Sequence, residues 1–202
     1  MKKTLATLAV LFAAYSASAA TLTWSITNIL VPETTTGEKG AGYTAYLFIT
    51  QQSDDFGSTV TTVDAVKNLI ESGAEFYTET TGTGTEQVTK NYLKKGDDKI
   101  QIAGTGTSNN SGIINGNTGY YGAFDAGNSL TAFAVILDGA TLPGASNYIV
   151  TSTKSASWTS ATGSKSLGFG SQANATWTPV PEPSTAVLAL AGLALLLKRR
   201  RA

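Results

Sequence analysis

The side chains best suited to chemistry in this sequence are carboxylates that stand in pairs. Asp54-Asp55 and Asp97-Asp98 are adjacent in the chain, and further acids occur at Asp125 and Asp138. Hydrolysis of a glycosidic bond needs two carboxyl groups that face each other across a cleft. Each pair here lies beside residues typical of turns, where Asp is common because its side chain hydrogen-bonds the nearby backbone. The sequence therefore favours a structural role for these acids, and a polysaccharide hydrolase is the second alternative function.

The sequence lacks the residues on which most other catalytic mechanisms depend. The chain has no His and no Cys, so it has no imidazole base, no thiol nucleophile and no residues for a disulfide or a zinc site. A loop carboxylate could bind calcium, but no Asp-x-Asp-x-Asp-Gly loop is present. The glycine-rich stretches lack the lysine and the strand-loop-helix context of a phosphate-binding loop. We therefore expect a non-enzymatic protein with no catalytic residue, no metal and no cofactor.

Aromatic side chains offer a different chemistry, the binding of sugars by stacking. A flat ring presents apolar surface that can cover the C–H face of a sugar. Trp24 and Trp177 stand at positions expected to point into a core, whereas Tyr120, Tyr121 and Trp158 are candidates for an exposed stacking surface. A carbohydrate-binding module or adhesin is therefore the first alternative function.

The N-terminal segment has the three parts of an export signal. Two lysines follow the first methionine, and residues 5–15 form an apolar run. Ala17 and Ala19 then supply the small residues that signal peptidase requires. This order predicts that residues 1–19 are a signal peptide, cleaved after Ala19 or after Ala20.

The C-terminal segment combines a short polar motif, an apolar run and a basic end. About a dozen uninterrupted apolar residues are fewer than the roughly 17–25 that span a bilayer, but long basic side chains can reach outward to the interface. A helix that is apolar on every face and ends in four cations is unsuited to the core of a soluble domain. The run therefore predicts a membrane segment with its basic end in the cytoplasm, or a recognition tail that is later removed. The motif is Pro181-Glu182-Pro183, the apolar run includes Ala186, Val187, Leu188, Leu190, Leu193, Leu195, Leu196 and Leu197, and the basic end is Lys198, Arg199, Arg200 and Arg201.

This tail resembles the PEP-CTERM sorting domain of exported bacterial proteins. The resemblance covers residues 180–202 and rests on the motif, the apolar run and the basic end together. It implies processing by a membrane-embedded sorting protease of the exosortase type. It also implies a location at the cell surface, in the envelope or in an extracellular polysaccharide matrix. The preceding residues resemble the Gly/Thr/Ser-rich passenger domains of this class, which have no assigned activity, so the resemblance implies sorting but no reaction.

The net charge of zero conceals an acidic domain. Six of the fourteen basic residues lie in the two terminal segments, which leaves residues 20–180 with eight basic and thirteen acidic residues and a net charge near −5. A charge of this sign argues against binding nucleic acid or other anionic polymers by simple attraction.

Short runs with a period of two dominate residues 20–179, which are numerous enough for one domain with its own core. Many short strands separated by Gly and Asn predict a mainly β fold, a β-sandwich or jelly roll. The run 104–122, dense in Gly, Asn, Ser and Thr, is expected to be a long flexible loop. The expected strands are 21–27, 43–50, 74–80, 99–102, 130–137, 148–151, 167–169 and 173–178.

One segment has helical periodicity instead. Val63, Val66, Leu69 and Ile70 share one face of a predicted helix over residues 62–72. Threonine at 61 or 62 can cap its first turn and glycine at 73 suits its end. The chain thus divides into a signal peptide (1–19), a β-rich passenger domain (20–179) and a sorting and anchor segment (180–202). We expect an exported, surface-anchored protein with a structural or interaction role.

Overall fold

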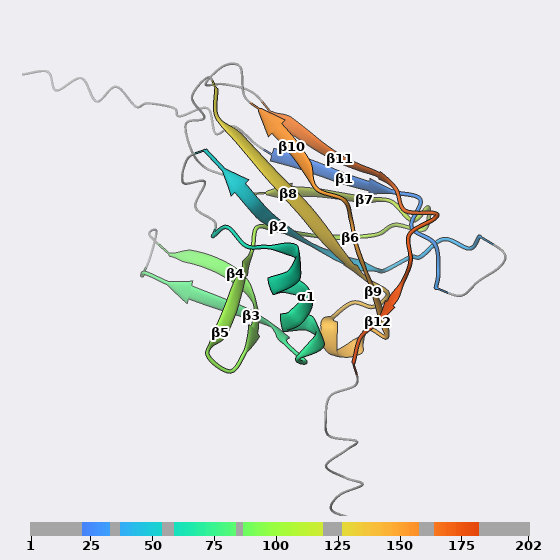
Figure 1. Ribbon diagram of the computed structural model, residues 1–202, viewed down its shortest axis with the longest axis horizontal. Coiled ribbons are helices and arrows are strands. Elements are labelled where there is room, and N and C mark those ends of the chain that lie inside the picture. The colour runs from blue at the N-terminus through green and yellow to red at the C-terminus, as the bar shows by residue number, and fades with distance from the viewer. Residues whose placement is uncertain are drawn as a thin grey trace, which may run out of the picture.

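The structure is a computed structural model that describes residues 22–32, 37–53, 59–83, 87–118, 127–157 and 164–181. These residues are mainly β with one α-helix, which confirms the predicted class (Figure 1). The predicted signal peptide, including Ala17, Ala19 and Ala20, lies outside the described residues. In chain order the elements are β1 (Leu22–Thr27), β2 (Thr44–Gln52), α1 (Val63–Glu71), β3 (Glu75–Thr81), β4 (Val88–Lys95), β5 (Asp98–Ile102), β6 (Gly104–Thr107), β7 (Ile114–Thr118), β8 (Ser129–Leu137), the 3₁₀ helix η2 (Leu142–Gly144), β9 (Asn147–Val150), β10 (Lys154–Ser157), β11 (Lys165–Ser171) and β12 (Thr178–Pro179).

A central sheet with the order β12-β9-β8-β2-β6 is built around its two nine-residue strands, β2 and β8. These strands pair antiparallel, and β10 extends the sheet beside the first half of β8. Side chains of β2 alternate between two separate core clusters, with Leu47 in one and Phe48 in the other. Both faces of this sheet are therefore covered, and continuous apolar runs are the sequence pattern that such burial requires.

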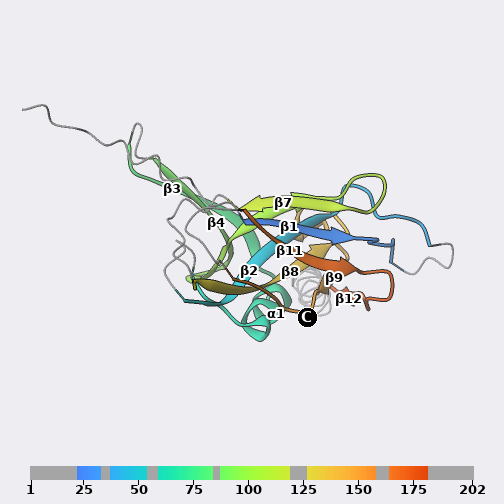
Figure 2. The ribbon, with the colours of Figure 1, turned by 90° about the horizontal axis from the view of Figure 1, so that it is seen from above.

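The sheet with the order β11-β1-β7 covers one face of the central sheet. Figure 2 shows it along one side of the molecule. Its middle strand alternates buried and half-buried residues, and Leu22, Trp24 and Ile26 point into the shared core. The alternation predicted for residues 21–27 is confirmed, and so is the core position of Trp24.

The prediction of a flexible loop over residues 104–122 is wrong, because β6 and β7 lie within it. These strands contain few apolar residues because the indole of Trp24 supplies the apolar bulk between them. A Cβ atom placed on Gly116 would lie 2.2 Å from the indole, and one on Gly106 would lie 3.2 Å from it. The glycines therefore provide the space for a large side chain from a neighbouring strand, and they do not mark a loop.

Helix α1 and the sheet with the order β3-β4-β5 cover the opposite face of the central sheet. Val66, Leu69 and Ile70 are the buried residues of the helix, as its periodicity predicted. The side chain of Thr62 accepts a hydrogen bond from the backbone of Ala65 at 3.1 Å. Gly73 follows the helix with a φ of +81°, the left-handed conformation that ends many helices.

The strand predicted for residues 173–178 is also wrong, since only Thr178 and Pro179 form a strand, β12. The backbone N–H of Ala175 donates to the carbonyl of Gln172 at 3.1 Å in a turn. Trp177 is half-buried and packs edge-on against Tyr43, with ring centroids 5.7 Å apart. The polar and apolar alternation therefore reflects packing at the margin of a core, without a partner strand.

Candidate functional site

The acids singled out from the sequence do not converge on one site where the structure describes them. Asp97 and Asp98 are exposed at the turn between β4 and β5. Asp138 accepts hydrogen bonds from the backbone N–H groups of Ser146 and Asn147 at 2.8 and 2.9 Å. Within the described ranges no group of three or more His, Cys, Asp or Glu side chains is placed to hold a metal ion. Asp54, Asp55 and Asp125 lie outside those ranges.

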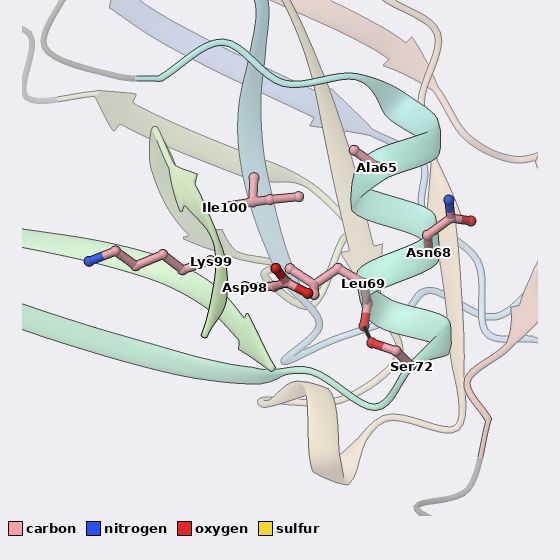
Figure 3. Close-up of a pocket in the computed structure, with 7 residues that line it drawn as sticks. All are labelled: Ala65, Asn68, Leu69, Ser72, Asp98, Lys99 and Ile100. Atoms are coloured by element: carbon pink, nitrogen blue, oxygen red, sulfur yellow. Dashed lines mark hydrogen bonds between the residues drawn. The ribbon is translucent and has the colours of Figure 1, made fainter. Parts of the chain in front are cut away.

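A groove of about 380 Å³ lies between α1 and β5 (Figure 3). One carboxylate, Asp98, lines it, and the ammonium of Lys99 points away from it. The hydroxyl of Ser72 already donates to the carbonyl of Leu69 at 2.7 Å. The groove therefore lacks the facing pair of carboxyl groups that glycoside hydrolysis needs. Its lining residues are Ala65, Asn68, Leu69, Ser72, Asp98, Lys99 and Ile100.

The sugar-stacking residues predicted from the sequence, Tyr120, Tyr121 and Trp158, lie outside the described residues. Other aromatic side chains are exposed in the part of the chain that the structure describes. Phe76 and Tyr77 on β3 keep 39% and 40% of their surfaces in solvent. Both belong to the β3-β4-β5 sheet, which projects from the rest of the molecule (Figure 2).

The two faces of this sheet differ in character. Phe76 lies on the inner face, where its ring stacks on Tyr46 at a centroid distance of 5.7 Å. Tyr77 lies on the other face and is directly opposite Tyr92 of β4. Directly opposed residues in an antiparallel pair point to the same side, so the strand register fixes the members of each face. The outer face comprises Glu75, Tyr77, Glu79, Lys90, Tyr92, Lys94 and Lys99, together with Gln101, which is buried.

Lysine side chains lie across the two tyrosine rings of the outer face. The Nζ atom of Lys94 is 4.5 Å from the centre of the Tyr77 ring. The Nζ atom of Lys99 is 4.7 Å from the centre of the Tyr92 ring. The same atom forms an ion pair with the Oε2 atom of Glu79 at 2.8 Å. Ammonium groups at such distances are attracted by the negative face of the ring. The three strands are thereby joined by diagonal contacts between side chains.

The Lys99–Glu79 contact affects both groups. The hydrogen bond from Lys99 lowers the pKa of the Glu79 carboxyl below its usual range. The same hydrogen bond raises the pKa of the Lys99 ammonium. Both groups are therefore held in their charged forms around neutral pH, although solvent weakens such an exposed pair.

Sequence reasoning missed this face because it missed β4. The segment from Val88 to Lys95 contains three lysines and has little apolar content. A signal was nevertheless present in the turn that follows it, Gly96-Asp97. Gly96 has a φ of +61°, and glycine at the first position of a two-residue turn is typical of a hairpin. That turn, placed between the alternating residues on either side, predicts the β4-β5 hairpin.

The C-terminal tail leaves the domain at its last strand. β12 pairs antiparallel with β9, and the backbone N–H of Val180 donates to the carbonyl of Ser146 at 2.8 Å. Val180 packs against the core on the α1 side, and Pro181 follows it in an exposed position. The predicted sorting motif thus begins directly after the last backbone hydrogen bond of the domain. Its remaining residues, the apolar run and the basic end (182–201) lie outside the described residues.

Comparison with known proteins identifies this tail. Residues 179–202 match the family model of the PEP-CTERM protein-sorting motif, which confirms the resemblance seen in the sequence. The motif implies export, sorting in association with the membrane, and processing by an exosortase-type protease. No curated protein and no solved structure matches the chain. Among the described residues, no helix has both the length and the apolar character needed to span a bilayer.

Proposed function

We propose that this chain is an exported protein of the cell surface or extracellular matrix, with a non-enzymatic structural or interaction role. The observation that carries the proposal is the PEP-CTERM motif at residues 179–202, which starts within β12 itself. The folded domain is therefore presented directly beside the site of sorting. In this proposal the apolar tail holds the chain in the membrane until a sorting protease acts, and the domain functions outside the cell.

The architecture of the domain supports an interaction role. One core cluster lies between the central sheet and the β11-β1-β7 sheet, and a second lies between the central sheet and the layer of α1 and the β3-β4-β5 sheet. The groove between α1 and β5 is lined by a single carboxylate, that of Asp98. Surface-exposed β domains of this kind are suited to binding through a sheet face, since the fold itself does not prescribe a reaction.

Expression in a host with an exosortase-type protease, and in the same host without it, tests the proposal. Fractionation and intact mass should show a mature chain that begins at Ala20 or Thr21 and a tail that is removed only when the protease is present. Glu182→Ala should insert into the membrane but escape processing, and removal of residues 181–202 should release a folded domain. A chain that retains Met1, or a deletion variant that stays in the envelope, would contradict the proposal.

A carbohydrate-binding module is a second candidate function. The observation that favours it is the exposed tyrosine on the outer face, with a second tyrosine directly opposite. Aromatic rings on a projecting sheet are suited to contact the apolar face of a sugar.

A further inference from the structure

Lysine residues are concentrated on the projecting β3-β4-β5 sheet. Residues 20–180 contain eight lysines, and four of them lie between Lys90 and Lys99. Three of these four belong to the outer face, where two glutamates accompany them. A face with a net positive charge thus occurs on a domain whose total charge is near −5. In physiological salt a charge acts only within roughly 8–10 Å. The net charge of the whole domain, which argued against binding anionic polymers, therefore does not describe this locally positive face.

Two of these lysines have donors to offer. The ammonium of Lys99 is bound to Glu79, whereas the ammonium groups of Lys90 and Lys94 form no ion pair or hydrogen bond with any described residue. Lys94 is held over the Tyr77 ring, so its ammonium stands at a defined place beside an exposed aromatic surface. Little side-chain freedom is lost when such a group binds a ligand, which favours affinity.

A sugar that carries a carboxylate matches this pair of features. Its C–H face can contact the part of Tyr77 that remains in solvent, while its carboxylate accepts a hydrogen bond from Lys94. A polymer can continue along β4 toward Lys90, which lies four residues away, or about 13 Å along a strand. Two lysines at this distance suit a polysaccharide whose carboxylates are separated by whole sugar rings. Nucleic acid carries one charge per about 1.7 Å of duplex, a spacing far closer than that of Lys90 and Lys94.

We propose that the outer face of the β3-β4-β5 sheet binds an acidic polysaccharide of the uronic-acid type, with the solvent-exposed part of Tyr77 as the stacking surface and Lys90 and Lys94 as the carboxylate partners. This inference rests on the proposed function, because export brings the face into contact with extracellular polysaccharide. The groove beside α1 takes no part, since Lys99 is directed away from it.

Binding of polygalacturonate to the exported protein, purified from the envelope in detergent, tests the inference. Neutral dextran and a single-stranded oligodeoxynucleotide serve as comparison ligands. We expect polygalacturonate to bind, dextran to bind much more weakly, and the affinity for polygalacturonate to fall as salt is added. Tyr77→Ala and Lys94→Gln should each weaken binding by about fivefold. Tyr77→Phe, which keeps the ring, should bind as well as the wild type.

Lys154→Gln is the matched control, because it removes the same charge from an exposed position on β10, in another sheet. It should leave binding unchanged. An equal loss of binding in this control and in Lys94→Gln would overturn the inference, as would equal affinities for dextran and polygalacturonate. Tighter binding of the oligodeoxynucleotide than of polygalacturonate would assign the face to nucleic acid instead and would overturn it too.

Intact mass on the same preparations separates this inference from the proposed function. A correctly processed chain that fails to bind polygalacturonate would overturn the inference and leave the sorting role in place. An unprocessed chain would contradict the sorting role, whatever it binds. The melting temperature of each variant confirms that the substituted proteins are folded.

Discussion

The central pair of strands, β2 and β8, differs from the projecting β3-β4-β5 sheet in how many of its faces are buried. Residues 45–49 of β2 and residues 132–137 of β8 are buried without interruption, since another layer covers each face of their sheet. The β3-β4-β5 sheet buries Leu93 and Ile102 on one face, whereas the other face, apart from the buried Gln101, is exposed or half-buried. Side chains that can bind a partner are therefore available on the projecting sheet and are excluded from the central one.

The comparison also separates stability from function. Apolar area removed from water contributes about 25 cal/mol per Å², and β2 and β8 contribute buried apolar side chains to both core clusters. The outer face is held by cation–aromatic contacts and one exposed ion pair, which contribute little. A substitution on the outer face should therefore alter binding while the fold persists. The same kind of substitution in the central strands should reduce stability first.

Truncation of matched phenylalanines gives the largest expected difference between the regions. Phe48 is fully buried and stacks on Phe133 at 5.4 Å, whereas Phe76 is 39% exposed. Phe48→Ala should lower the free energy of unfolding by about 3–5 kcal/mol. Phe76→Ala should lower it by about 1 kcal/mol, since much of its ring is already in solvent. Urea denaturation of both variants measures the difference, and equal losses would show that the projecting sheet is as well packed as the centre.

Added bulk beside Trp24 should have the next largest effect. A Cβ on Gly116 would meet the indole at 2.2 Å, while a Cβ on Gly168, in β11, meets nothing within 4 Å. Gly116→Ala should therefore destabilise the protein by about 1–3 kcal/mol through overpacking. Gly168→Ala is the matched control and should be close to neutral. A neutral Gly116→Ala would mean that the β6 and β7 region can move away from the indole, as the flexible loop expected from the sequence would.

The strands predicted correctly are those whose own residues carry the pattern. β1 alternates, β2 and β8 are continuously apolar, and α1 has both its caps in the sequence, so each could be recognised without its neighbours. β6 and β7 could not be recognised in this way, because the side chain that packs against Gly106 and Gly116 comes from β1. The burial of β6 and β7 results from tertiary packing, which the local periodicity of the sequence does not report.

The tail and the outer face differ in the same respect. The sorting motif is read as a linear sequence, and residues 180–202 sufficed to predict it. The outer face is assembled from three strands, and Lys99 reaches Glu79 across twenty residues. The net charge of the domain concealed the outer face further, since acidic residues elsewhere in the domain outnumber the lysines of the β4-β5 hairpin. Only the register of β3, β4 and β5 places the tyrosines and lysines on one side.

Loss of the helix cap tests how firmly α1 is fixed beside the projecting sheet. Thr62 accepts the hydrogen bond from Ala65 that satisfies the first turn of α1. Thr62→Ala should lower the free energy of unfolding by about 1 kcal/mol, and Thr62→Ser should restore most of the loss because the hydroxyl remains. Urea denaturation followed by circular dichroism provides the measurement. If serine failed to restore stability, the methyl group of Thr62 would matter more than its hydroxyl.

The smallest expected effect is on the outer face itself, in the ion pair of Lys99 and Glu79. Lys99 lowers the pKa of the Glu79 carboxyl. The stabilisation from the pair is therefore fully present above the pKa of an unfolded glutamate and is lost as the pH falls through the lower, folded value. The raised pKa of Lys99 gives the opposite limit, since its contribution is lost as the pH rises through the folded value of the ammonium.

Lys99→Gln should accordingly lower the urea midpoint slightly at neutral pH. It should not change the midpoint in acid, because there the wild type has also lost the ion pair. Added salt should shrink the shift at neutral pH, because both partners are exposed. Lys154→Gln, which removes a lysine that has no ion pair among the described residues, controls for the change in net charge. A Lys99→Gln shift that persisted in acid would have to come from the packing of the lysine stem over the Tyr92 ring. The outer face would then be held by aromatic contact instead of charge, and the distinction between the two sheets would narrow to the amount of apolar surface that each one buries.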